Sequence, residues 1–471
     1  MPGKFKIVIS DLHLSAGRVA EGNPLEDFGS DQDLASFLDE VAAESDGDGA
    51  EVELIVNGDG FEMLQVPHVD EFDPPHEYRP EQYHSSSELD SERKMALIIA
   101  GHPVFFEALE RFIQAGPPPR YLTFVKGNHD VNLHWPAVQR AIREAIGATG
   151  DRAPLLIFEE RRIRREGIYV EHGNQYAEAV DRVDDMEEPH DHDKPGQLAI
   201  PAGSWFVMDV FNEVERDKYW IDGVKPITAL VWYALAYDFP FAARSIATLI
   251  RALPGIFSEV MRDVEEPGPE EPSAALLHQL EDPDQVAEMA ERYESDEAFR
   301  AEFNAEVAGI LADSSELDTG DMARAPRQPD PVAIGDQIRT RVNSALFEIA
   351  KQRAQEENVK LVTFGHTHDA VEEPLPDGGS YINSGTWTWR ADLSAAGEHT
   401  WRELFEHPER FTDNRLLSYV RIDYDGAGEP RGSLMAYEPS ADPSPDERGG
   451  DAKPSASFLD RFAAWLGLGT A

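Results

Sequence analysis

The chain has 471 residues, 90 of them Asp or Glu and 42 Lys or Arg, which gives a formal net charge of −48 at pH 7, and it contains no cysteine. This charge repels phosphate backbones and anionic lipids, so it argues against broad binding of nucleic acid. The lack of cysteine excludes disulfides, thiolate metal sites and iron–sulfur clusters, so any metal must be bound by nitrogen and oxygen ligands. Such an excess of carboxylates is typical of an acidic cytoplasmic protein or of one that works in a high-salt cytosol.

Short runs rich in β-branched and aromatic residues alternate with helical patterns along the chain. The β-type runs lie at 6–9, 52–56, 121–125, 167–170 and 360–364. Apolar residues with helical spacing lie between them at 34–43 and 94–114. Strands that alternate with helices predict an α/β protein, in which ligands bind beyond the carboxyl ends of the strands.

The composition divides the chain into three parts. Segments 1–177 and 355–425 carry the alternation of strands and helices and are predicted to form one core. Segment 178–354 is predicted to be a helical, partly acidic insertion that could form a wall or lid beside the site of this core. Segment 426–471 predicts a linker rich in Gly, Pro, Ser and Asp, followed by an amphipathic C-terminal helix.

The apolar runs of the chain are short. The longest, at 227–237, is well below the length that spans a bilayer, and residues 5–9 are too few for the apolar core of a signal peptide. We therefore expect a soluble cytoplasmic protein without a transmembrane segment, and peripheral contact with a membrane stays open. Aromatic residues of the insertion could form its core or line a pocket for a lipid or nucleotide portion; they are Trp205, Phe206, Tyr219, Trp220, Trp232, Tyr233 and Tyr237.

Side chains that can bind a metal follow each of the five predicted strands. In chain order they are Asp11 and His13, Asp59 with Glu62, Asn128 with His129 and Asp130, His172, and His366 with His368. One histidine near a strand end is more often structural, but five such groups at the edge where ligands gather indicate a metal site. Residues i and i+2 of an extended segment point the same way, so each Asp-x-His or His-x-His motif would present two ligands together. Glycines at 58, 127, 173 and 365 would let the backbone turn sharply there.

The motifs Asp-x-His, Gly-Asp-x-x-Glu, Gly-Asn-His-Asp, His-Gly and Gly-His-Thr-His, in this order, resemble those of the calcineurin-like metallophosphoesterase superfamily. The resemblance covers 1–177 and 355–425. It implies a β-sandwich of two mixed sheets flanked by helices, with a di-metal centre at the strand ends. One cation would be bound by Asp11, His13, Asp59 and His368, and the other by Asp59, Asn128, His172 and His366, with Asp59 bridging.

The same resemblance implies a metal-dependent phosphoester hydrolase: a phosphodiesterase, pyrophosphatase or phosphatase. A hydroxide that bridges two divalent cations would attack phosphorus in line. Mn²⁺ is the favoured cation, and Fe, Zn²⁺ and Co²⁺ are the alternatives. His129 would contact the phosphate and protonate the leaving oxygen, and Glu62 or Asp130 would orient His129.

The residues in and around the motifs narrow the choice of substrate class. Protein phosphatases of the superfamily carry Arg-Gly after the second motif, where this chain has Met63-Leu64, so a phosphoprotein substrate is disfavoured. Segments 10–14 and 57–62 resemble the branch that contains UDP-diacylglucosamine pyrophosphatases and Mre-type nucleases, although the lipid-pathway enzymes carry Arg where His129 stands here. We expect the substrate to be a small phosphoester or pyrophosphate, and a lipid or nucleotide portion linked to it stays open. The alternatives are a nuclease and a catalytically silent metal-binding scaffold.

Overall fold

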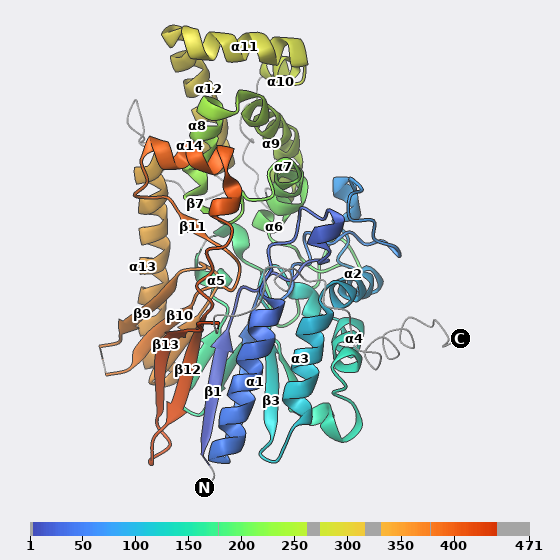
Figure 1. Cartoon of the computed structure of the whole chain (residues 1–471), viewed down its shortest axis with the longest axis vertical. Coiled ribbons are helices and arrows are strands. Elements are labelled where there is room, and N and C mark those ends of the chain that lie inside the picture. Colours follow the sequence, from blue (N-terminus) through green and yellow to red (C-terminus); the bar gives the residue numbers. More distant parts are fainter. Residues whose placement is uncertain (1–2, 178, 261–273, 316–330, 377, 440–471) are drawn as a thin grey trace.

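Two mixed β-sheets lie at one end of the long axis of the molecule, and a group of helices lies at the other end (Figure 1). The computed structural model describes residues 3–177, 179–260, 274–315, 331–376 and 378–439. Within these ranges the chain is an α/β protein, as the sequence predicts. None of the helices in these ranges combines the length and the hydropathy that crossing a bilayer requires.

The larger sheet has six strands in the order β13-β12-β1-β2-β3-β4. Their bounds are β1 Lys4–Ile9, β2 Glu51–Asn57, β3 Arg120–Val125, β4 Leu156–Glu159, β12 Ser418–Tyr424 and β13 Pro430–Ala436. Strands β1 to β4 are parallel, whereas β12 is antiparallel to both of its neighbours. Both faces of the sheet are buried: in β1, Ile7 and Ile9 pack on helices while Val8 packs on the second sheet. Burial on two faces explains why the predicted strands read as continuous apolar runs.

The smaller sheet has five strands in the order β5-β6-β8-β10-β9. Their bounds are β5 Arg162–Arg165, β6 Ile168–Glu171, β8 Leu361–Phe364, β9 Ala370–Pro374 and β10 Ser380–Ser384. The central strands β6, β8 and β10 are parallel, and the two edge strands are antiparallel. The two sheets pack face to face, because Val8 and Ile55 of the larger sheet share a hydrophobic core with Ile382 of the smaller one.

Helices cover the outer faces of both sheets. On the larger sheet they are α1 Asp31–Asp48, α2 Glu88–Gly101, α3 Pro103–Gln114 and α4 Pro136–Ala145; on the smaller sheet they are α5 Asn174–Ala177 and α13 Pro331–Glu357. The helical pattern at 94–114 is divided between α2 and α3. The division falls at Pro103, which has no N–H to continue a helix but suits the first position of a new one.

The other α-helices of the described residues form a group that we call the helical body. It consists of α6 Ala202–Phe206, α7 Asn212–Asp217, α8 Ile227–Tyr237, α9 Phe239–Val260, α10 Ala274–Leu280, α11 Pro283–Ser295, α12 Glu297–Ser315 and α14 Glu398–Glu406. Trp220 is buried in its core, and Trp232, Tyr233 and Tyr237 pack against that core. These four aromatic side chains therefore contribute to packing, whereas Tyr219 is 45% exposed.

Two segments differ from the boundaries that composition suggests. Trp389, Trp401 and α14 were expected in the core segment 355–425 but pack in the helical body, and β7 (Val224–Lys225) pairs with β11 (Ala391–Asp392) between the two parts. The prediction of a linker from residue 426 onward is wrong for its first part, because β13 extends the larger sheet there. The predicted C-terminal amphipathic helix lies outside the described residues.

Single-turn segments connect the longer elements. They are η1 Val19–Glu21, η2 Pro80–Gln82, η3 Val131–His134, η4 Gly150–Leu155, η5 Ala179–Asp181, the π-turn η6 Val207–Phe211 and η8 Pro408–Arg410.

Candidate metal centre

The predicted ligands lie where five strands of the two sheets end. Asp11 follows β1, Asp59 follows β2, Asn128 follows β3, His172 follows β6, and His366 with His368 follows β8. Because β1, β2 and β3 are parallel, as are β6 and β8, their carboxyl ends meet at one edge of each sheet. The packing of the two sheets brings these edges together, on the side that faces the helical body (Figure 1).

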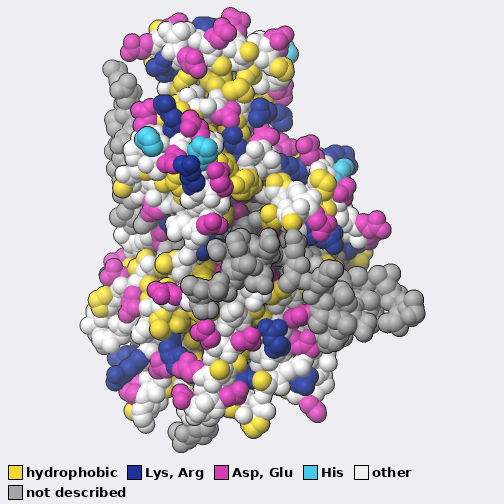
Figure 2. All heavy atoms as spheres, in the orientation of Figure 1, with side chains coloured by type: hydrophobic (Ala, Val, Ile, Leu, Met, Phe, Trp, Pro, Cys, Tyr) yellow, Lys and Arg dark blue, Asp and Glu magenta, His cyan; other side chains and the backbone are white. Residues whose placement is uncertain are grey.

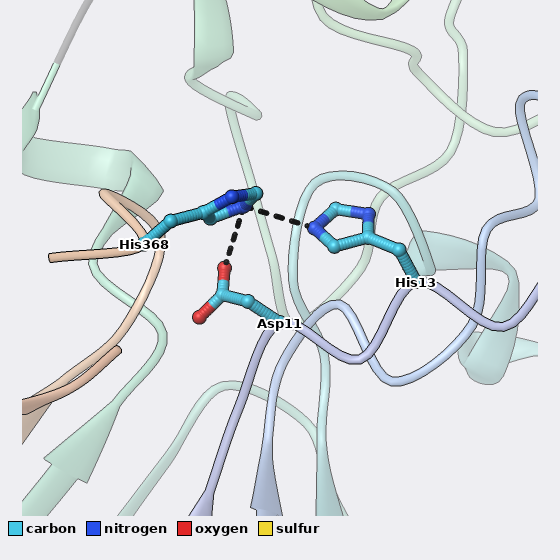
Figure 3. Close-up of side chains that lie close together, drawn as sticks. All are labelled: Asp11, His13 and His368. Carbon is cyan, nitrogen blue, oxygen red and sulfur yellow. Dashed lines mark hydrogen bonds and ion pairs between the residues drawn. The ribbon is translucent and has the colours of Figure 1, made fainter. Parts of the chain in front are cut away.

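Asp11, His13 and His368 form the first cluster, and one ligand atom from each lies within 4.8 Å of the others (Figure 3). His368 Nε2 lies 3.1 Å from His13 Nε2 and 3.5 Å from Asp11 Oδ1. Burial and the neighbouring His13 hold the pKa of His368 well below its usual value. His368 is therefore a neutral imidazole, the form that binds a metal.

Asp59, His172 and His366 form the second cluster, again with ligand atoms within 4.8 Å of one another. His172 Nδ1 donates to the carbonyl oxygen of Asn57 at 2.9 Å, so Nε2 is the atom that faces the cluster. His172 Nε2 lies 3.0 Å from Asp59 Oδ2, out of line for a hydrogen bond. Burial lowers the pKa of His172, but the charge of Asp59 outweighs burial and raises it to about 9.

Asp59 connects the two clusters, because it also lies within 4.8 Å of His13 and His129. Its Oδ1 accepts the backbone N–H of His129 at 2.9 Å, while Oδ2 faces His172. Burial alone would raise the pKa of this carboxyl, but the charges of His172 and His129 outweigh burial and lower it well below its usual value. Asp59 is thus a buried carboxylate with histidines on both sides, as a bridging ligand requires.

Glu62 contacts two histidines of the site. Its Oε2 lies 2.8 Å from His13 Nδ1 and 2.6 Å from His129 Nδ1. Burial lowers the pKa of His129, but the charges of Glu62 and Asp59 outweigh burial and raise it to about 10. Burial raises the pKa of Glu62, but His129 and His13 more than offset this and lower it to about 2. Glu62 therefore fixes both rings through their Nδ1 atoms, so that the Nε2 side of each ring faces away from Glu62.

Asp130, the other residue expected to orient His129, turns away toward the backbone. Its carboxylate accepts the N–H groups of Gly60 at 2.9 Å and Gly127 at 2.6 Å, and it is fully buried. Burial and the nearby Asp59 raise the pKa of Asp130 to about 7. Asp130 thus holds together the loops after β2 and β3, and the contact with the His129 ring is made by Glu62.

The backbone explains how the ligands converge, and it corrects one expectation. Of the nine non-glycine residues with positive φ among those described, five are predicted ligands: Asp11, His13, Asp59, His366 and His368. The extended geometry expected for the Asp-x-His and His-x-His motifs is wrong, because both residues of each pair are left-handed. Gly127 has another role than turning: a Cβ there would overlap Asp59 Oδ1. Its lack of a side chain lets the two loops approach closely.

Three residues of segment 178–354 also reach the site, and sequence reasoning did not identify them. Asp181 Oδ2 lies 3.4 Å from His366 Nε2, and Ser204 Oγ donates to the carbonyl oxygen of Asn128 at 3.5 Å. Lys225 in β7 is close enough to lower the pKa of His368 further. None of them lies in a recognisable motif, so only the tertiary structure could reveal them.

Two buried atoms of the site test whether a metal fits. Asn128 Oδ1 and His172 Nε2 are buried and make no hydrogen bond to any described residue. An unsatisfied buried acceptor costs about 1–3 kcal/mol, so such atoms call for a partner. An amide oxygen and an imidazole nitrogen that gives up its proton to a cation are ligands of the kind that suits Mn²⁺, Fe or Zn²⁺. The predicted ligand set therefore fits a pair of divalent cations.

No protein-family model matches this chain, and no curated protein matches it.

Proposed function

We propose that this protein is a di-metal-dependent phosphoester hydrolase of the calcineurin-like metallophosphoesterase superfamily. The observation that carries the proposal is the position of Asp59, whose carboxylate lies between His13 and His129 on one side and His172 and His366 on the other. The face-to-face sheets with helices on both outer faces are compatible with the sandwich that the motifs imply.

Each residue has a defined task in this proposal. Asp11, His13, Asp59 and His368 would hold one cation, and Asp59, His172 and His366 together with Asn128 would hold the other. When bound, the two cations would neutralise charge on the phosphoryl oxygens and lower the pKa of a water molecule between them. His129, with a side chain that is 19% exposed, holds a proton at neutral pH and donates it to the leaving oxygen. Glu62 keeps the His129 ring in place through Nδ1.

The surface favours a small substrate over a nucleic acid. On the face shown in Figure 2, acidic side chains are interspersed with lysines and arginines at both ends of the molecule. With a net charge of −48, long-range attraction to a polyanion is unfavourable. A small phosphodiester, pyrophosphate or phosphomonoester can reach the cations without such attraction. Ser204, which contacts Asn128, and Lys225, which lies near His368, show that segment 178–354 approaches the candidate metal centre.

Hydrolysis of bis-p-nitrophenyl phosphate and p-nitrophenyl phosphate, with and without added Mn²⁺, tests the proposal. We expect turnover that depends on Mn²⁺ and is abolished in Asp59→Asn together with bound metal. Asp39→Asn, which changes an exposed carboxylate of α1, should retain both. A protein that binds two metals but hydrolyses neither substrate would instead be the silent scaffold, and cleavage of DNA alone would favour the nuclease.

A further inference from the structure

Three carboxylates lie together outside the metal centre. Asp27 is in the loop before α1, Glu215 is in α7, and Asp222 is in the turn before β7. One oxygen from each lies within 4.8 Å of the others. They come from the core and from the helical body, so tertiary packing alone brings three negative charges together. Like charges at this distance repel, and a fold keeps them only where something else neutralises them.

Glu215 is the residue that demands a partner. It is 1% exposed, and its Oε2 accepts a hydrogen bond from Gln65 Nε2. Its Oε1 is buried and makes no hydrogen bond to any described residue. Burial raises the pKa of Glu215 well above its usual value, and the charges of Asp27 and Asp222 raise it further. A buried carboxylate with an oxygen that accepts no hydrogen bond from a described residue, within 4.8 Å of two more carboxylates, is suited to bind a cation.

We infer that Asp27, Glu215 and Asp222 form a binding site for a third cation, a hard divalent ion such as Ca²⁺. All three ligands are carboxylates, and oxygen ligands without imidazole distinguish this site from the histidine-rich centre. Asp27 and Asp222 are partly exposed, so the ion can enter and keep water ligands. The inference does not depend on the proposed hydrolase activity, because it uses no residue of that centre.

A cation here would join the two parts of the protein. Asp222 precedes β7, which pairs with β11, and the side chain of Trp389 just before β11 hydrogen-bonds to Asp27. The ion would thus fix α7 and the β7 turn against the loop before α1. Lys225, next to this turn, lies near His368. Occupancy of the third site therefore stabilises the wall of the catalytic site that the helical body provides.

Tb³⁺ luminescence, excited through tryptophan, tests the site directly, because Trp389 contacts Asp27. We expect saturable emission that Ca²⁺ displaces. Glu215→Gln and Asp222→Asn should each weaken binding about tenfold or more, because the ligand charge falls. Glu213→Gln, on the same helix but outside the cluster, should bind like the unchanged protein. Emission that Ca²⁺ displaces as readily in Glu215→Gln as in the unchanged protein, or emission that never saturates, would overturn the inference.

Thermal unfolding separates a cation site from carboxylates that merely share protons. Ca²⁺ should raise the melting temperature of the unchanged protein and of Asp59→Asn, but not that of Glu215→Gln. Without Ca²⁺, Glu215→Gln should melt no lower than the unchanged protein, because Gln is neutral and does not repel Asp27 and Asp222; this control shows that the variant folds. If Ca²⁺ leaves the melting temperature of the unchanged protein as it was, protons neutralise the cluster and the inference is wrong.

Discussion

His102 lies between two buried carboxylates, and replacing it tests the electrostatic reasoning used above. The residue stands between α2 and α3, with Nδ1 3.0 Å from Asp31 Oδ1 and Nε2 3.1 Å from Glu26 Oε2. The side chain of His102 is 2% exposed, that of Asp31 9% and that of Glu26 1%. Glu26 also accepts the backbone N–H of Gly17 at 2.6 Å. The contact therefore anchors the loop that follows the first ligand motif and carries Asp27.

The raised pKa of His102 determines how much its charge stabilises the folded protein. Burial lowers this pKa, but the charges of Asp31 and Glu26 outweigh burial and raise it to about 10. In an unfolded chain it is about 6.5. The folded state thus binds the proton more tightly, and this stabilisation is complete below pH 6.5 and lost as the pH rises through 10. Linkage makes this stabilisation about 3 kcal/mol larger at pH 6 than at pH 9.

His102→Gln removes this contribution and leaves two buried carboxylates without a cation. Urea unfolding should show a variant less stable than the unchanged protein, with a difference about 3 kcal/mol larger at pH 6 than at pH 9. His399→Gln, at an exposed position of α14, is the matched control and should show no such dependence on pH. A loss of stability in His102→Gln that is equal at both pH values would refute the reasoning, because it would reflect packing rather than charge.

Three further predictions concern the metal centre. His129→Gln should lower turnover about 10²–10⁴-fold with unchanged metal content; loss of metal, measured by mass spectrometry, would identify it as a ligand instead. Glu62→Gln should lower Mn²⁺ affinity or turnover about 10–100-fold, because His13 and His129 both lose their carboxylate partner. Unchanged kinetics would show that Glu62 does not orient these two histidines. Gly127→Ala should abolish metal binding, since its Cβ would overlap Asp59 Oδ1; a variant that still binds two metals would contradict this.

The order of the ligands could be predicted from the sequence because each follows a strand. The runs before Asp11, Asp59 and His172 are apolar on both faces, which marks buried strands, and strand ends gather in an α/β fold. Such reasoning needs only local pattern and a general rule of topology. It identifies residues that the structure brings together, because their positions depend on where strands end, which the turn residues after each strand reveal.

The remaining features depend on contacts between distant segments and leave no local signal. Asp181 and Lys225 approach the metal centre only because the helical body packs on the core. Likewise Trp401 reads as part of the core segment but packs in the helical body, because β7 and β11 pair across the boundary. The left-handed backbone at Asp11 also escapes prediction, since Asp is compatible with both extended and left-handed conformations.

Several features that oppose folding occur at the two proposed cation sites. A left-handed conformation costs an L-residue about 1–2 kcal/mol, and five predicted ligands adopt it. Among the buried polar atoms that make no hydrogen bond to a described residue are Asn128 Oδ1 and His172 Nε2 at the metal centre and Glu215 Oε1 in the carboxylate cluster. A fold selected for stability alone would remove such costs by simple substitutions, because they contribute nothing to packing. A cation bound at each of the two proposed sites would offset these costs.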